Sequence, residues 1–192
     1  MTLTKSVTRL AVATAFLLLI PLVAMQFTPE VVWTLSDFVV AGLLLFGAGL
    51  TFELAARQAN TPAYRVAVGV TVAVALFLVW TNLAVGLIGS ENNPANLLYG
   101  GVLGVLFIGT IVARLQPRGM SHALFATALA QMAVPVLALL IWKPLIIAEE
   151  APIGGIVHVL GVNVFFAALW VGAALLFRRA SAGGSPQNRQ LA

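Results

Sequence analysis

The chain has 192 residues, of which 61% are hydrophobic and 8% are charged, with a formal net charge of +4. A soluble domain has about 25% charged residues, so this composition excludes a soluble protein and indicates an integral membrane protein. The absence of cysteine excludes disulfides, cysteine nucleophiles and thiolate metal sites, and the scattered basic residues argue against nucleic-acid binding.

Six apolar runs are each long enough to cross a bilayer, which takes ~20 residues of helix. Helices are expected over residues 10–27, 37–56, 66–88, 97–115, 123–142 and 153–177. The predicted fold is an all-α polytopic bundle of six transmembrane helices. It forms a single domain, residues 1–179, and residues 180–192 are expected to be a disordered cytoplasmic tail.

The basic residues predict the orientation of this bundle. In a six-crossing arrangement, nine of the ten lie on one side and only Lys143 lies on the other. Because Lys and Arg gather in short cytoplasmic loops, both termini are predicted to be cytoplasmic. The outer side then carries the polar turn of residues 90–96 and the acidic pair Glu149 and Glu150.

Glu53 is the one acidic residue expected on the side of the arginines. It lies four residues before Arg57, a spacing that predicts an ion pair on the surface of a helix. The alternative is a carboxylate that relays protons, because ionisable groups within a membrane are often functional.

A candidate polar pocket is expected near the outer helix ends, formed by Asn82, Asp37, Glu91, Asn96 and His158. Its excess of acids would suit a cation or a small amine. Each member also has a local explanation: Asp37 and Asn93 as helix caps, Glu91 and Asn96 in a solvated turn, and His158 as a packing or interfacial residue. These local explanations are favoured.

A second polar group is expected near the middle of the membrane. Gln131 lies near the centre of the fifth helix, Thr127 shares its face, and Pro135 removes the helical donor of the Gln131 carbonyl, which predicts a kink. Asn163 lies near the middle of the sixth helix. These side chains either line a solute path or hydrogen-bond neighbouring helices, and the second interpretation is favoured.

Small residues spaced four apart predict close helix packing on the second, fourth and sixth helices. The glycines expected to take part are Gly42, Gly47, Gly100, Gly104 and Gly172. Such faces would form either the tight core of the bundle or a contact between copies.

Residues 80–99, the run Asp37-Phe-Val-Val-Ala-Gly and the turn Pro117-Arg118-Gly119-Met120 resemble small uncharacterised multi-pass proteins of bacterial inner membranes. The resemblance covers most of the chain. It implies a location in the inner membrane, and it brings no activity and no functional residue with it.

The sequence contains no phosphate-loop or metalloprotease motif, and no catalytic residue, metal site or cofactor is expected. The expected function is that of a non-catalytic structural or accessory subunit. It would contact the lipid bilayer and a membrane-protein partner or a second copy, with no nucleic acid. The alternative is a small-solute or cation channel or transporter with an outward-facing polar pocket.

Overall fold

The computed structural model describes residues 3–59, 61–148 and 152–183. These residues form helices and no strand. The helices are α1 (Leu3–Phe27), α2 (Leu35–Ala56), α3 (Pro62–Ala84), the short 3-10 helix η1 (Pro94–Leu97), α4 (Leu98–Ala113), α5 (Pro117–Ala148) and α6 (Pro152–Gly183). With η1 continuing into α4, six helices are long and apolar enough to cross a membrane. The predicted all-α, six-helix class is confirmed, and the chain is a multi-pass helical membrane protein.

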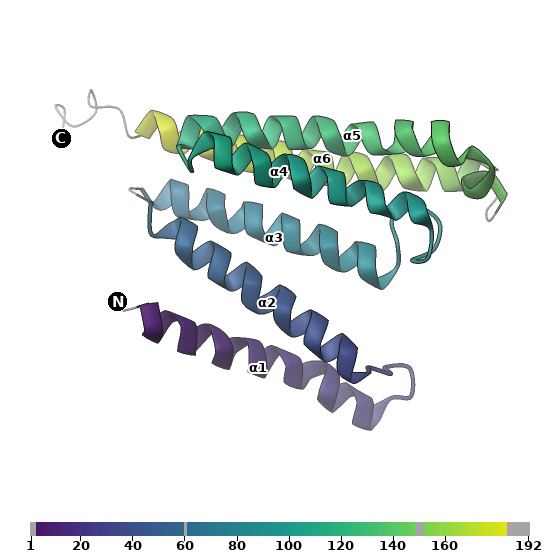
Figure 1. Ribbon diagram of the computed structural model, residues 1–192, viewed down its shortest axis with the longest axis horizontal. Helices are drawn as coiled ribbons and strands as arrows, with labels where there is room; N and C mark the ends of the chain where they lie inside the picture. Colours follow the sequence, from purple (N-terminus) through teal and green to yellow (C-terminus); the bar gives the residue numbers. More distant parts are fainter. Residues whose placement is uncertain (1–2, 60, 149–151, 184–192) are drawn as a thin grey trace. The chain divides into compact units, whose positions relative to one another are not determined.

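The contacts within the chain divide it into two compact units. Unit 1 comprises Met1–Arg57 and contains α1 and α2, whereas unit 2 comprises Gln58–Ala192 and contains α3 to α6 (Figure 1). Each unit is described separately below.

Unit 1 is an antiparallel pair of helices. Ser6 near the start of α1 bonds Glu53 near the end of α2, and Leu18 contacts Gly42 closer to the start of α2. Thr34 caps α2, because its side chain accepts from the backbone N–H of Asp37 while the Asp37 carboxylate accepts from the N–H of Thr34. Asp37 is therefore the third residue of the helix and completes a capping box, which corrects its prediction as the cap.

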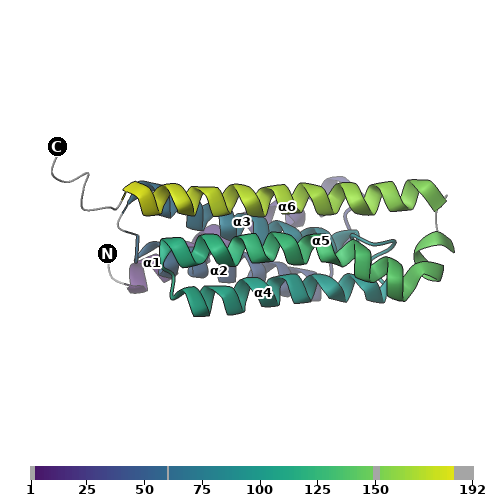
Figure 2. The ribbon, with the colours of Figure 1, turned by 90° about the horizontal axis from the view of Figure 1, so that it is seen from above.

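In unit 2, α5 and α6 pack side by side along most of their length, with α4 against α5 and α3 against α6 (Figures 1 and 2). Helices α3 and α6 run antiparallel, because the Tyr64 ring lies 5.2 Å from Phe177 and the Phe77 ring lies 5.3 Å from Phe166. Helices α4 and α5 approach closely at Gly109, where an added Cβ would lie 2.7 Å from the Ala123 Cβ.

Several helix boundaries differ from the sequence prediction, among them the start of α1, which lies at Leu3 instead of residue 10. Helix α3 ends at Ala84 instead of residue 88, because Gly86 adopts a left-handed φ of +69° and turns the chain. Helix α5 begins at Pro117, earlier than predicted, and α6 continues to Gly183, so residues 180–183 are helical and do not belong to the tail. Polar residues continue a helix without difficulty once it leaves the apolar layer, so hydropathy alone underestimates its length.

Candidate functional site

Four deeply buried polar side chains of unit 2 form one hydrogen-bonded network. It joins Tyr99 of α4, Gln131 of α5, and Asn163 and Trp170 of α6, all of which are buried. The Gln131 Nε2 donates to the Asn163 Oδ1 at 3.0 Å, and the Asn163 Nδ2 donates to the Tyr99 hydroxyl oxygen at 3.0 Å. The Trp170 indole N–H donates to the Gln131 Oε1 at 3.4 Å. The network therefore ties three helices together.

Every member of this network is uncharged, and both amide oxygens accept a hydrogen bond. The Asn163 Nδ2 also donates to the Val159 carbonyl at 2.8 Å, so the Asn163 amide engages both its own helix and the neighbouring helices. A buried polar group without a partner is costly, and these bonds avoid that penalty. The arrangement is suited to holding helices together.

The structure brings together two of the four residues expected at mid-membrane. Gln131 and Asn163 meet, whereas Thr127, although buried, donates to the Ala123 carbonyl of its own helix at 2.9 Å. Pro135 is buried within α5, which continues through it. Sequence reasoning missed Tyr99 and Trp170 as network members. The sequence does contain a signal for both, because a tyrosine hydroxyl or a tryptophan indole N–H inside an apolar helix needs a hydrogen-bond partner.

The loop between α3 and α4 is organised by the buried side chain of Asn96. Its Oδ1 accepts from the backbone N–H groups of Leu87 and Ile88 at 3.0 and 2.9 Å. Its Nδ2 donates to the carbonyls of Ile88 and Ser90 at 3.3 and 2.7 Å. The predicted cap at Asn93 is present at the start of η1, where the Asn93 Oδ1 accepts from the Ala95 N–H.

Of the five candidate pocket residues, two are in direct contact. The Asn82 Nδ2 donates to the backbone carbonyl of Asn96 at 3.4 Å, and the Asn82 Oδ1 is buried with no hydrogen-bond partner among the described residues. Glu91 is exposed in the same loop and accepts from Asn92. His158 is exposed on α6, and Asp37 belongs to unit 1.

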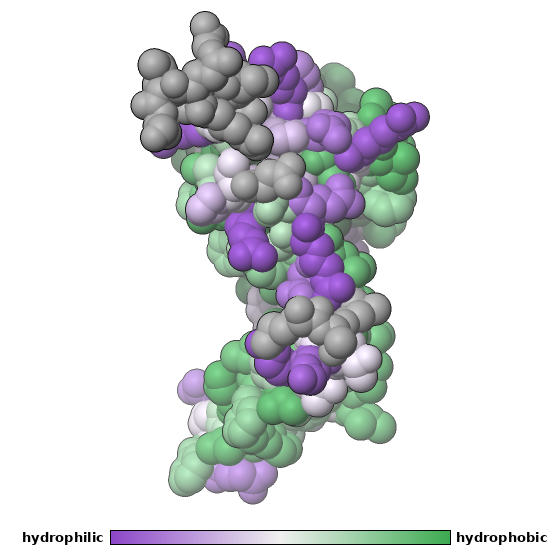
Figure 3. Space-filling model, turned by 90° about the vertical axis from the view of Figure 1, so that its left-hand side faces the viewer, coloured by the Kyte–Doolittle hydropathy of each residue, from purple (hydrophilic) through white to green (hydrophobic). Residues whose placement is uncertain are grey.

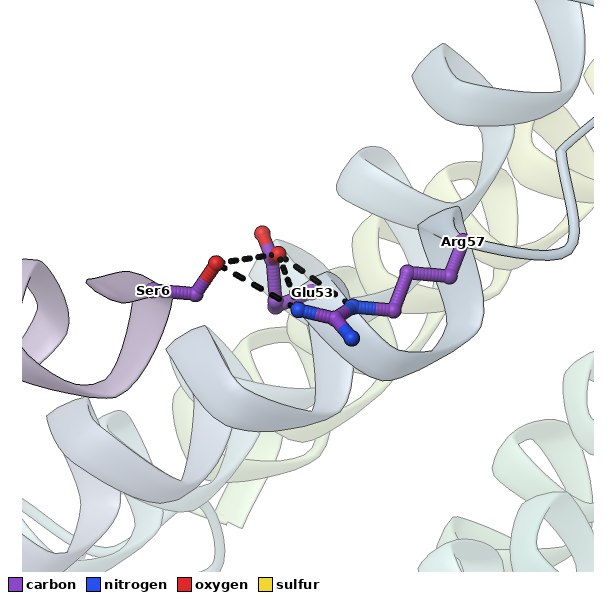
Figure 4. Close-up of polar contacts among 3 residues, drawn as sticks. All are labelled: Ser6, Glu53 and Arg57. Carbon is purple, nitrogen blue, oxygen red and sulfur yellow. Dashed lines mark hydrogen bonds and ion pairs between the residues drawn. The ribbon is translucent and has the colours of Figure 1, made fainter. Parts of the chain in front are cut away.

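Unit 1 contains a second polar cluster, formed by Ser6, Glu53 and Arg57 (Figure 4). The buried Ser6 hydroxyl donates to the Glu53 Oε1 at 2.7 Å, and the Arg57 Nη2 forms a salt bridge with the same oxygen at 3.1 Å. The expected i,i+4 ion pair is therefore present. Because the carboxylate bonds both helices, the cluster fastens the N-terminal end of α1 to the C-terminal end of α2.

Of the five glycines predicted to pack helices closely, one has a close neighbour among the described residues. Gly42 lies 3.4 Å from the Leu18 Cδ1, measured from an added Cβ. An added Cβ at any of the others would have no described neighbour within 4 Å: Gly47, Gly100, Gly104 and Gly172. The close approaches occur instead at Gly49, Gly109 and Gly119. Spacing along one helix carries no information on what lies opposite its face.

No cluster of three His, Asp or Glu side chains able to hold a metal ion occurs in the residues that the structure describes. Glu149, Glu150 and the side chain of Lys143 lie outside them. Comparisons of the chain with protein-family models, with curated proteins and with solved structures find no match.

Proposed function

We propose that this protein is a non-catalytic structural or accessory subunit of a membrane assembly. The observation that carries the proposal is the closed network of Tyr99, Gln131, Asn163 and Trp170. Its polar groups form hydrogen bonds between helices, an arrangement that suits a scaffold better than a reaction centre or a hydrated path. The open faces of Gly100, Gly104 and Gly172 leave room for the backbone of another helix.

Native mass spectrometry of the protein, gently solubilised from its own membrane, tests this proposal. We expect a protein partner or a second copy in stoichiometric amount. A Gly100→Leu variant should fold normally, because nothing lies within 4 Å of the added Cβ, and should lose that partner. The matched control is Ala126→Leu, which introduces the same side chain at an exposed position of α5 and should keep the partner. A wild-type particle containing one copy and no other protein would contradict the proposal.

We further propose that the chain lies in a bacterial inner membrane with both termini in the cytoplasm. The bias of basic residues and the resemblance to inner-membrane proteins support this orientation. Since the natural chain has no cysteine, single cysteines can be introduced and labelled without background. A membrane-impermeant maleimide should label Glu91→Cys in intact cells, and Gln116→Cys only after permeabilisation. Both positions are exposed. The reverse pattern would invert the orientation.

The alternative function, a small-solute or cation channel or transporter, is favoured by one observation. The buried Asn82 Oδ1 has no partner among the described residues and lies beneath the polar loop, so it can accept a hydrogen bond from a bound solute. Asn82→Leu would then abolish a cation flux into vesicles that hold the purified protein. If the natural protein and Asn82→Leu assemble equally well and neither carries a cation flux, the result would favour the accessory role.

A further inference from the structure

Three segments of unit 2 that are distant in sequence meet at Tyr64. Its hydroxyl donates to the Leu115 carbonyl at 2.6 Å, and its ring packs edge-on against Phe177. The start of α3, the turn between α4 and α5, and the end of α6 therefore share one end of the unit. Five arginines lie on these segments: Arg65, Arg114, Arg118, Arg178 and Arg179.

All five arginine side chains are exposed, and within the described residues none forms an ion pair with a carboxylate. The only acidic residue described in unit 2 is Glu91, which follows the opposite end of α3. Figure 3 looks onto the arginine-bearing end, where hydrophilic side chains gather between apolar flanks. This basic end, defined by the five arginines, thus presents positive charge without a counter-ion among the described residues of unit 2.

The turn that carries Arg114 and Arg118 has an unusual, well-braced backbone. Arg114 and Leu115 have left-handed φ values of 49° and 57°, a conformation that L-residues adopt at some cost in energy. The Tyr64 bond to the Leu115 carbonyl holds this turn. Gly119 packs so closely against α4 that an added Cβ would lie 2.8 Å from the Ala113 Cβ. The arginines are consequently presented by a fixed turn.

Apolar side chains flank the basic end on the side toward the membrane. Ile111 and Val112 of α4, 60% and 76% exposed, lie three and two residues before Arg114. Exposed Val66 follows Arg65, and exposed Leu175 lies one turn before Arg178 and Arg179. A ligand that contacts both the arginines and these apolar side chains must combine an anionic head with long apolar chains.

We propose that the basic end of unit 2 binds the headgroups of anionic phospholipids in the bilayer that the protein spans. Guanidinium groups match phosphate oxygens in two-pronged hydrogen bonds, and clusters of basic residues beside membrane helices attract anionic lipids. The flanking apolar side chains select a lipid over a free phosphate ion. This inference requires that the helices span a membrane, as the basic end must lie beside lipid. It does not depend on the proposed accessory role.

The test measures lipids that stay bound to the full chain. The protein is placed in nanodiscs with equal amounts of phosphatidylglycerol and phosphatidylcholine, then released and analysed by native mass spectrometry. We expect preferential retention of phosphatidylglycerol. The variants Arg65→Gln, Arg118→Gln and Arg178→Gln should each reduce this preference roughly fivefold, since each basic residue near a membrane surface contributes about that factor. The triple variant should reduce it by roughly the product of the three single effects, because Arg114 and Arg179 remain.

Asn92→Asp is the matched control, because it lowers the net charge by one unit at an exposed position in the loop that carries Glu91. It should leave the lipid preference unchanged, and all variants should keep the thermal stability of the natural protein in detergent. The proposal would be overturned if the triple variant kept the lipid preference of the natural protein. It would also be overturned if Asn92→Asp lost as much of that preference as a single arginine variant. Displacement of the lipid by inorganic phosphate alone would also overturn it, because the site would then take a free anion.

Discussion

Replacing Asn96 with alanine is expected to destabilise unit 2 by about 3–4 kcal/mol, since each buried backbone group that loses its partner costs roughly 1–3 kcal/mol. The Asn96 side chain serves four backbone groups, namely the N–H groups of Leu87 and Ile88 and the carbonyls of Ile88 and Ser90. The loop lies at the end of two helices, so water can reach some of these groups, which keeps the expected loss below the full sum.

The measurement is chemical or thermal unfolding of the protein in detergent, followed by the loss of helical circular dichroism. The matched control is Asn92→Ala in the same loop. Asn92 is exposed, and its side chain donates only to Glu91, so its loss should change stability by less than about 0.5 kcal/mol. Equal stability of the two variants would show that Asn96 does not hold the loop.

The helical class could be predicted from the sequence because it depends on composition and run length, which are local properties. The cap at Asn93 was predictable for the same reason, since Asn followed by Pro94 suits the start of a helix. The end of α3 was not predictable from the sequence. Residues 85–88 continue the apolar run, and only the distant Asn96 side chain satisfies the loop backbone that replaces the helix.

The partners of the buried polar residues also lay beyond the sequence. Gln131 and Asn163 could each be recognised as needing a partner, but which residue supplies it depends on how far one helix is shifted along the other. That shift is set by packing across the interface between the two helices, and no spacing within one helix encodes it. The same reason explains why the glycine faces were predicted with no knowledge of their neighbours.

The five basic residues of the basic end were used in the sequence analysis only as signals of orientation. Their common location depends on Tyr64, which contacts both Leu115 and Phe177. A pattern of charges along the chain predicts the side of the membrane on which each one lies. It does not predict that three distant segments gather into one surface, and the proposed binding site for a lipid headgroup depends on that convergence.

A double-mutant cycle on Gln131 and Asn163 should reveal a coupling of about 1 kcal/mol, within the range of ~0.6–2 kcal/mol for hydrogen bonds between membrane helices. Asn163→Leu removes the acceptor of the Gln131 Nε2 and the donor to the Tyr99 hydroxyl, so its cost should be about 2 kcal/mol. Gln131→Leu also deprives the Trp170 indole N–H of its acceptor. The double variant should lose less stability than the sum of the two, because the second replacement removes a group already left unpaired by the first.

The control cycle pairs Gln131→Leu with Thr127→Val on the same face of α5. Thr127 bonds only the Ala123 carbonyl of its own helix, so the two losses should add within about 0.5 kcal/mol. Unfolding in mixed micelles of increasing SDS content supplies the free energies for both cycles. Additivity of Gln131 and Asn163 would mean that their hydrogen bond contributes little in the membrane. A coupling found only in the first cycle would show that this bond between α5 and α6 contributes to stability.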